Sequence, residues 1–114
     1  MTPAVAYKVL TDAEMKALEA GPFEGAAIDR QDGYIHLSTA EQLTETVDKH
    51  FAGESDLWVA AVDLDAQDDP VKWEPSRGGA LFPHLYGALL LETVIAYGPL
   101  KRHDDGTVKL PVAG

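Results

Sequence analysis

Residues 32–46 read D-G-Y-I-H-L-S-T-A-E-Q-L-T-E-T and combine a turn, a short strand and the start of a helix. The turn is predicted at Gly33, because glycine adopts positive φ without steric cost. Residues 34–37 then alternate with the two-residue period of a strand. This alternation directs Ile35 and Leu37 toward a hydrophobic core.

Two polar side chains, Tyr34 and His36, fall on the opposite face of the same strand. Ser38 and Thr39 follow, and each has Glu or Gln three residues later, which is the pattern of a helix N-cap. The strand therefore delivers a histidine to a helix N-terminus, where free backbone N–H groups favour an anion. We expect a functional site at this junction.

The composition is that of an ordinary globular domain. The chain has 114 residues, of which 46% are hydrophobic, so we expect one domain over 1–114 with its core at about 5–100. A net charge of −10 argues against direct binding to nucleic acid or to an anionic membrane. No apolar run approaches the ~20 residues that span a bilayer, and no signal-peptide pattern is present, so we expect a cytoplasmic protein. The absence of cysteine excludes disulfides and thiolate nucleophiles.

The order of the predicted elements indicates an α+β domain with a mixed or largely antiparallel sheet. A first helix is expected after Thr11, which begins a capping box with Glu14, and a second helix is expected to end near Gly53. Residues 23–31 are expected to form a loop between these helices. The strand at 57–64 is apolar on nearly both faces, which predicts a central position in a sheet. The other extended segments are expected at 7–10, 34–37, 71–74, 82–87, most of 88–97 and, as an edge strand or tail, 107–112.

The candidate functional residues come from two motifs, one before and one after the predicted central strand. The candidate catalytic residues are His36, Glu74, His84 and Tyr86. The candidate ligand-binding residues are Tyr34, Ser38, Thr39, Arg77 and Gly78. Histidine suits acid–base chemistry near neutral pH, and arginine can clamp a phosphate or carboxylate. The alternative interpretation is structural: the two hydroxyls only cap a helix, and the histidines only form hydrogen bonds within the fold.

Other common site chemistries have little support in the sequence. A metal site needs at least three ligands, which His36, His84 and Glu74 could supply, but no H-x-H, H-x-x-x-H or H-E-x-x-H spacing occurs. Ser38 lacks the G-x-S-x-G pattern of a hydrolase nucleophile. Neither a phosphate-binding G-x-x-x-x-G-K-[ST] loop nor a dinucleotide G-x-G-x-x-G motif is present. We therefore expect no metal site and no cofactor that the sequence identifies with certainty.

Three stretches together resemble the DUF952 family of small bacterial and plant proteins. They are Y-K-V-L at 7–10, D-G-Y-I-H-L-S-T-A-E-Q at 32–42, and K-W-E-P-S-R-G-G-A-L-F-P-H-L-Y-G-A-L at 72–89. The resemblance covers residues 7–99. It implies a fold of the ADP-ribosyltransferase-like superfamily, whose members split NAD in a cleft between two small sheets.

The same resemblance implies roles for individual residues. His36 would correspond to the strand-end histidine that holds the ribose of NAD. Tyr86, or His84 beside it, would lie where an aromatic residue packs on nicotinamide. Glu74 and Glu92 are both candidates for the acid that orients the ribose or the acceptor, and the resemblance does not choose between them.

Two functional hypotheses follow for a small-molecule ligand. The first is an ADP-ribosyl or phosphoryl transferase for which NAD is a possible substrate. The alternative is a non-catalytic module that binds a nucleotide or a small anionic metabolite in the same cleft. The two are separated by geometry, because a catalytic site should assemble His36, a hydroxyl, Tyr86 and a carboxylate around one pocket. The oligomeric state stays open.

Overall fold

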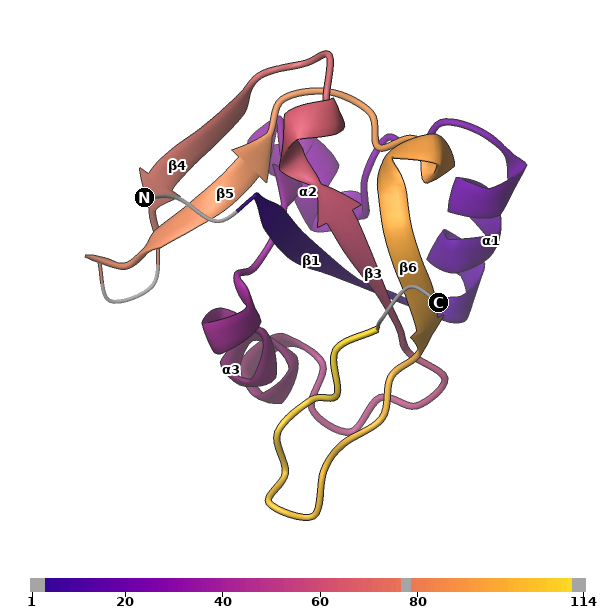
Figure 1. Ribbon diagram of the computed structural model, residues 1–114, viewed down its shortest axis with the longest axis vertical. Helices are drawn as coiled ribbons and strands as arrows, with labels where there is room; N and C mark the ends of the chain where they lie inside the picture. Colours follow the sequence, from indigo (N-terminus) through magenta and orange to yellow (C-terminus); the bar gives the residue numbers. More distant parts are fainter. Residues whose placement is uncertain (1–3, 77–78, 112–114) are drawn as a thin grey trace.

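Two three-stranded antiparallel sheets form the frame of the molecule (Figure 1). The computed structural model describes residues 4–76 and 79–111. In the first sheet β3 (Trp58–Asp63) lies between β1 (Val5–Leu10) and β6 (Val94–Pro99). The inner residues of β3 are all buried, as its nearly continuous apolar sequence predicted. Its predicted central position is confirmed.

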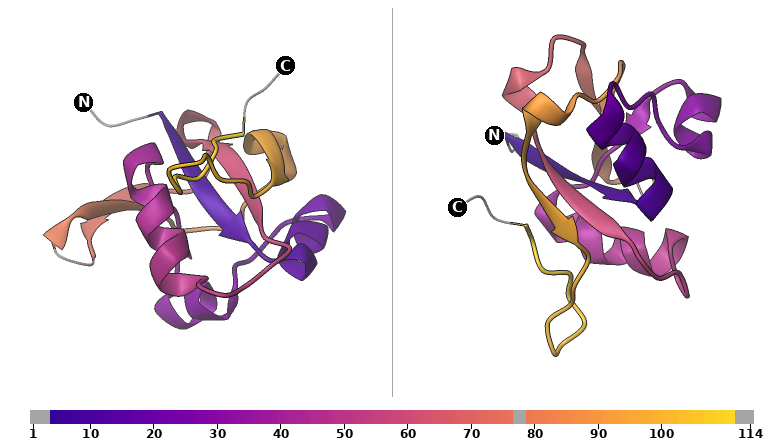
Figure 2. Two further views of the ribbon diagram at one scale, coloured as in Figure 1. Left: turned by 90° about the horizontal axis from the view of Figure 1, so that it is seen from below. Right: turned by 90° about the vertical axis from the view of Figure 1, so that its right-hand side faces the viewer.

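The second sheet is smaller and carries the two histidine motifs. Its central strand is β5 (Leu81–Leu85), with β2 (Ile35–His36) and β4 (Val71–Pro75) at its edges. Figures 1 and 2 show β4 and β5 extending to one side, beyond the first sheet. An antiparallel bridge between Tyr7 and Ser38 joins β1 to the residues that follow β2. The two sheets therefore meet just after the predicted histidine-bearing strand.

Two helices begin with the capping boxes that the sequence predicted. These are α1 (Asp12–Ala20), capped by Thr11, and α3 (Ala40–His50), capped by Thr39. In each box the threonine side chain accepts from the N–H three residues later, and the side chain of that residue accepts from the threonine N–H. Ser38 is not the cap; its hydroxyl shares a 2.8 Å hydrogen bond with Thr46.

A third helix lies where a loop was expected, so that prediction for residues 23–31 is wrong. It is α2 (Ala27–Asp32), and it covers one end of the second sheet beside β2 (Figure 1). Six residues are too short for an apolar periodicity to show. Its first turn is closed by the Asp29 carboxylate, which accepts from the Ala26 N–H, and its end is set by Gly33 at φ 88°.

The core consists of two clusters of buried side chains. The first fills the space among β1, β3, α1 and the second sheet, and it includes Leu10, Met15, Leu18, Ile35, Leu37, Leu85 and Leu89. The second lies under α3, which Figure 2 shows beside β1, and it contains Val9, Leu43, Val47, Leu57, Val59 and Val108. The inward positions predicted for Ile35 and Leu37 are confirmed.

The segment at 88–97 is only partly the strand that its β-branched residues predicted. Leu89 pairs with Phe23 in an isolated bridge, and Leu91–Thr93 form a 3-10 turn before β6 begins. The remaining pairing matches the prediction of an α+β fold with antiparallel strands. Among the helices of residues 4–76 and 79–111, none has the length and apolar character needed to cross a membrane.

Candidate functional site

Four rings gather on the face of the second sheet opposite the core side chains Ile35 and Leu85. His36 of β2 and His84 of β5 are register partners, and their ring centroids lie 5.4 Å apart. The Tyr34 ring stacks on His84 at 4.1 Å and lies 4.7 Å from His36 and 5.2 Å from Tyr86. We call Tyr34, His36, His84 and Tyr86 the ring cluster. Strand alternation predicted the shared face of each pair, and the pairing of β2 with β5 brings the two pairs together.

Glu74 of β4 joins two members of the ring cluster. Its Oε1 accepts a 2.7 Å hydrogen bond from the Tyr86 hydroxyl and lies 2.8 Å from His84 Nδ1. The hydrogen bond to Glu74 raises the pKa of Tyr86 to about 12. The hydrogen bonds from Tyr86 and His84 in turn lower the pKa of Glu74. Glu74 is therefore ionised at neutral pH and accepts from both rings, while Lys72 Nζ lies 4.6 Å from the Tyr86 ring centre.

Asp29 of α2 anchors the other histidine and is fully buried. Its Oδ1 accepts from His36 Nδ1 at 2.6 Å and from the His36 backbone N–H at 3.1 Å. Its Oδ2 accepts from Lys8 Nζ and from the Ala26 N–H, each at 2.8 Å. Burial raises the pKa of the Asp29 carboxyl, but the His36 hydrogen bond and the Lys8 charge outweigh that effect and hold the pKa well below its usual range. Asp29 is a structural anion.

Asp32 approaches the second nitrogen of the same imidazole. Its Oδ2 lies 2.9 Å from His36 Nε2, so a carboxylate oxygen faces each ring nitrogen of His36. Two N–H donors on an imidazolium satisfy this arrangement. The Asp32 side chain is 34% exposed, in contrast to Asp29 at 0%. Asp32 can therefore reach a ligand, whereas Asp29 cannot.

A cavity of about 610 Å³ opens beside the ring cluster, and we call it the cleft. Its size lies within the range of ligand pockets. One part of its wall is polar and includes Lys8, Asp32, His36, Ser38 and His84. Another part is apolar and includes Ile28, Phe51 and Phe82. The cleft can therefore receive a molecule with one polar and one apolar end.

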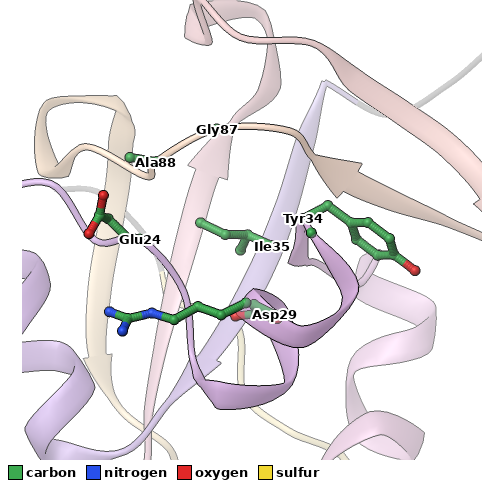
Figure 3. A pocket seen from close by; sticks show the side chains of 8 residues that line it. Glu24, Asp29, Tyr34, Ile35, Gly87 and Ala88 are labelled. Atoms are coloured by element: carbon green, nitrogen blue, oxygen red, sulfur yellow. The ribbon is translucent and has the colours of Figure 1, made fainter.

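A second cavity of about 460 Å³ lies against the side of α2, and we call it the side pocket (Figure 3). Figure 3 shows Glu24 and Ala88 at one end of this pocket, with the Tyr34 ring pointing away from them. Asp29 lines both cavities, but its carboxylate is occupied by the contacts described above. Of the ring cluster, only Tyr34 lines the side pocket, and neither histidine does.

The structure brings together five of the candidate site residues: Tyr34, His36, Glu74, His84 and Tyr86. Ser38 lies at the cleft wall, whereas Thr39 serves as the cap of α3. Glu92 is exposed in the 3-10 turn before β6 and does not line the cleft, so Glu74 is the one of the two glutamates that lies at the ring cluster. Arg77 and Gly78 lie outside the described residues.

Lys8, Asp29 and Asp32 contribute contacts that the sequence interpretation did not assign to the site. The sequence does contain a signal for the contact between Lys8 and a buried partner. Lys8 shares a strand face with Ala6 and Leu10, which are both fully buried. A lysine at such a position requires a buried partner. The sequence does not say that Asp29 is that partner, since the two residues are distant along the chain.

Replacing Gly25 with Ala tests how tightly α2 is held against the site. Gly25 has φ +115°, and a Cβ there would lie 2.7 Å from Asp29 Cβ. Because both the backbone strain and the contact oppose the change, we expect a loss of about 1–3 kcal/mol in the free energy of unfolding. Gly53→Ala is the control, since Gly53 also has positive φ but its Cβ would meet nothing within 4 Å. Equal losses in urea denaturation would show that Asp29 is not closely packed against Gly25.

The geometry defines a class of protein, a small α+β domain with a histidine-lined cleft. The chain belongs to the family described as "Protein of unknown function (DUF952)", whose sequence model matches residues 9–97. The predicted family membership is therefore confirmed.

Two solved structures of one relative share the fold. The crystal structure of protein CC0527 from Caulobacter crescentus is 46% identical, covers 93% of this chain and 94% of its own, and superposes with a TM-score of 0.82. The solution NMR structure of CC0527 gives a TM-score of 0.77 over 93% of this chain and 91% of its own. No curated protein matches the chain. None of these relatives carries a stated activity, so the ADP-ribosyltransferase resemblance stays a prediction.

Proposed function

We propose that the cleft binds a nucleotide-class small molecule in which a planar ring is joined to a sugar, with NAD and ADP-ribose as the first candidates. The observation that carries this proposal is the division of the cleft wall. Phe51 and Phe82 offer apolar surface to a ring, while Asp32, Ser38 and His84 offer hydrogen-bonding groups to a sugar. The resemblance to NAD-splitting proteins supports the same choice of ligand.

ADP-ribosyl transfer is the reaction that this site supports best. Breaking the bond between nicotinamide and ribose develops positive charge on the sugar, which a nearby carboxylate stabilises. Asp32 is at the cleft wall and one-third exposed, whereas Glu74 does not line the cleft and is bonded to Tyr86 and His84. We therefore assign the stabilising role to Asp32 and a positioning role to Glu74.

One observation favours the non-catalytic alternative. Both nitrogens of His36 face carboxylates, so this imidazole has no free nitrogen with which to exchange a proton with a ligand. His36 can still hold Asp32 and the cleft wall in place. In that case the domain would bind the nucleotide and leave it intact.

The test is a calorimetric and thermal-melting titration of the wild-type chain with NAD, ADP-ribose, nicotinamide and glutathione. A ligand that binds only the folded state adds about 2.7 kcal/mol of stability at a concentration of about 100 times its Kd. We expect NAD or ADP-ribose to bind, His36→Ala to weaken that binding, and His103→Ala, an exposed control, to leave it unchanged. The proposal fails if neither nucleotide binds the wild-type chain.

Release of nicotinamide from NAD then separates catalysis from binding. In the transferase case Asp32→Asn slows release while NAD still binds, because the lost charge matters most in the transition state. In the binding-module case the wild-type chain binds NAD and releases no nicotinamide above the rate in buffer.

A further inference from the structure

His84 has one polar atom that nothing in the described part of the chain satisfies. The residue is only 2% exposed, and its Nε2 has no hydrogen-bond partner among residues 4–76 and 79–111. Buried polar atoms are nearly always paired, so an orphaned one needs an explanation. The same imidazole forms part of the cleft wall. An occupant of the cleft is the natural partner for this nitrogen.

We propose that His84 Nε2 accepts a hydrogen bond from an uncharged donor of the bound ligand, either a sugar hydroxyl or a carboxamide N–H. The inference rests on the proposed function, because it assigns a specificity-determining contact within the same cleft. The sequence interpretation gave the contact with the ribose to His36, but both nitrogens of His36 face carboxylates. His84 is the histidine that has a ring nitrogen left for the ligand.

The tautomer of His84 follows from its anchor. Nδ1 lies 2.8 Å from a carboxylate oxygen of Glu74, and an ionised carboxylate can only accept. Nδ1 therefore carries a proton and donates it to Glu74. In the neutral imidazole this leaves Nε2 with a lone pair, which requires a donor.

The ring is held so that Nε2 keeps one direction. Tyr34 stacks on one face at 4.1 Å, and the backbone of His84 is fixed by its pairing with β2 and β4. A 180° flip of the imidazole would break the hydrogen bond to Glu74, and a tilt of its plane would break the stacking contact with Tyr34. A fixed acceptor at the wall of a pocket is the type of group that sets ligand orientation.

The lone pair of Nε2 selects an uncharged donor rather than a phosphate. Nε2 and an ionised phosphate oxygen both only accept hydrogen bonds, so neither can satisfy the other. The Glu74 carboxylate, 2.8 Å from Nδ1 of the same ring, also opposes a second anion nearby. A hydroxyl or an amide N–H donates to Nε2 and brings no charge.

The test uses His84→Asn, because the asparagine amide can donate to Glu74 in place of Nδ1 while Nε2 is removed. The matched control is His103→Asn, at an exposed histidine in the turn between residues 101 and 107. We expect His84→Asn to weaken calorimetric binding of NAD or ADP-ribose about tenfold or more, the effect of losing one buried hydrogen bond. His103→Asn should bind as the wild-type chain does. If His84→Asn binds NAD or ADP-ribose as tightly as the wild-type chain does, the inference about Nε2 is overturned. The proposal that the cleft binds a nucleotide is then unaffected.

A measurement on the wild-type chain covers the case in which His84→Asn does not fold. The ¹⁵N resonances of the His84 ring should show an unprotonated Nε2 at pH 7.5, and D-ribose or nicotinamide, but not inorganic phosphate, should shift that resonance. A protonated Nε2 in the free protein overturns the inference. If neither NAD nor ADP-ribose binds, the proposed function fails by itself. The inference then falls as well if D-ribose and nicotinamide leave Nε2 unchanged.

Discussion

Replacing Asp29 with Ala is expected to lower the free energy of unfolding by about 3–5 kcal/mol, the range for breaking a buried ion pair from one side. The Asp29 side chain is 0% exposed and its partner Lys8 only 7%. The substitution would leave the Lys8 ammonium buried without its counter-charge, and it would also remove acceptors from His36 and from the Ala26 N–H. Urea denaturation at pH 7 measures the loss.

Asp12→Ala is the matched control for that experiment. It removes an ion pair with Lys16, but the two side chains are 50% and 74% exposed, so solvent screens the interaction. We expect little change in the urea midpoint of this variant. Adding Lys8→Met to Asp29→Ala should recover part of the lost stability, because the unpaired cation is then gone. Similar losses for Asp29→Ala and Asp12→Ala would contradict the buried-pair account.

Acid is expected to destabilise the protein by protonating the same carboxylate. The folded-state pKa of Asp29 lies below its ordinary value of 3.8, so the unfolded chain takes up the proton first as pH falls. The stability that Asp29 provides is therefore complete above about pH 5 and is lost progressively as pH drops through 3.8 toward the folded-state pKa. Glu74, whose pKa is also lowered, acts in the same direction.

The measurement is a series of urea denaturations between pH 7 and pH 2.5. One carboxylate that is protonated only in the unfolded state gives a slope of up to about 1.4 kcal/mol per pH unit. Asp29→Asn removes this titration, so its stability should fall less steeply than that of the wild-type chain below pH 4. Parallel curves for the two proteins would show that Asp29 is not the acid-sensitive group.

The parts of the fold that the sequence predicted depend on contacts within a few residues. Gly33 adopts the positive φ expected of it, and Thr11 and Thr39 form the expected capping boxes. The alternation placed His36 on the same face as Tyr34, and His84 on the same face as Tyr86, because side-chain direction repeats every two residues. Each of these patterns lies within a single turn, helix start or strand, so it can be recognised without knowing the contacts with the rest of the chain.

The parts that were missed depend on contacts between distant residues. The helix α2 is too short for a periodic pattern, and it is held by Asp29 through Lys8 of β1 and His36 of β2. No local signal connects these three residues. For the same reason the sequence could not show that the Tyr86 hydroxyl donates to Glu74 and that Tyr86 does not line the cleft. Nor could it show that Asp32 is a carboxylate at the cleft wall.

The most direct test of the binding cleft is to locate ADP-ribose on the wild-type chain by ¹H–¹⁵N NMR titration. We predict saturable shifts for amides at His36, Ser38 and His84, on the strands and the junction that line the cleft. Amides of the turn at 103–106 should stay unchanged. Shifts confined to another surface, or no saturable shift at all, would contradict the assignment of the cleft as a nucleotide site.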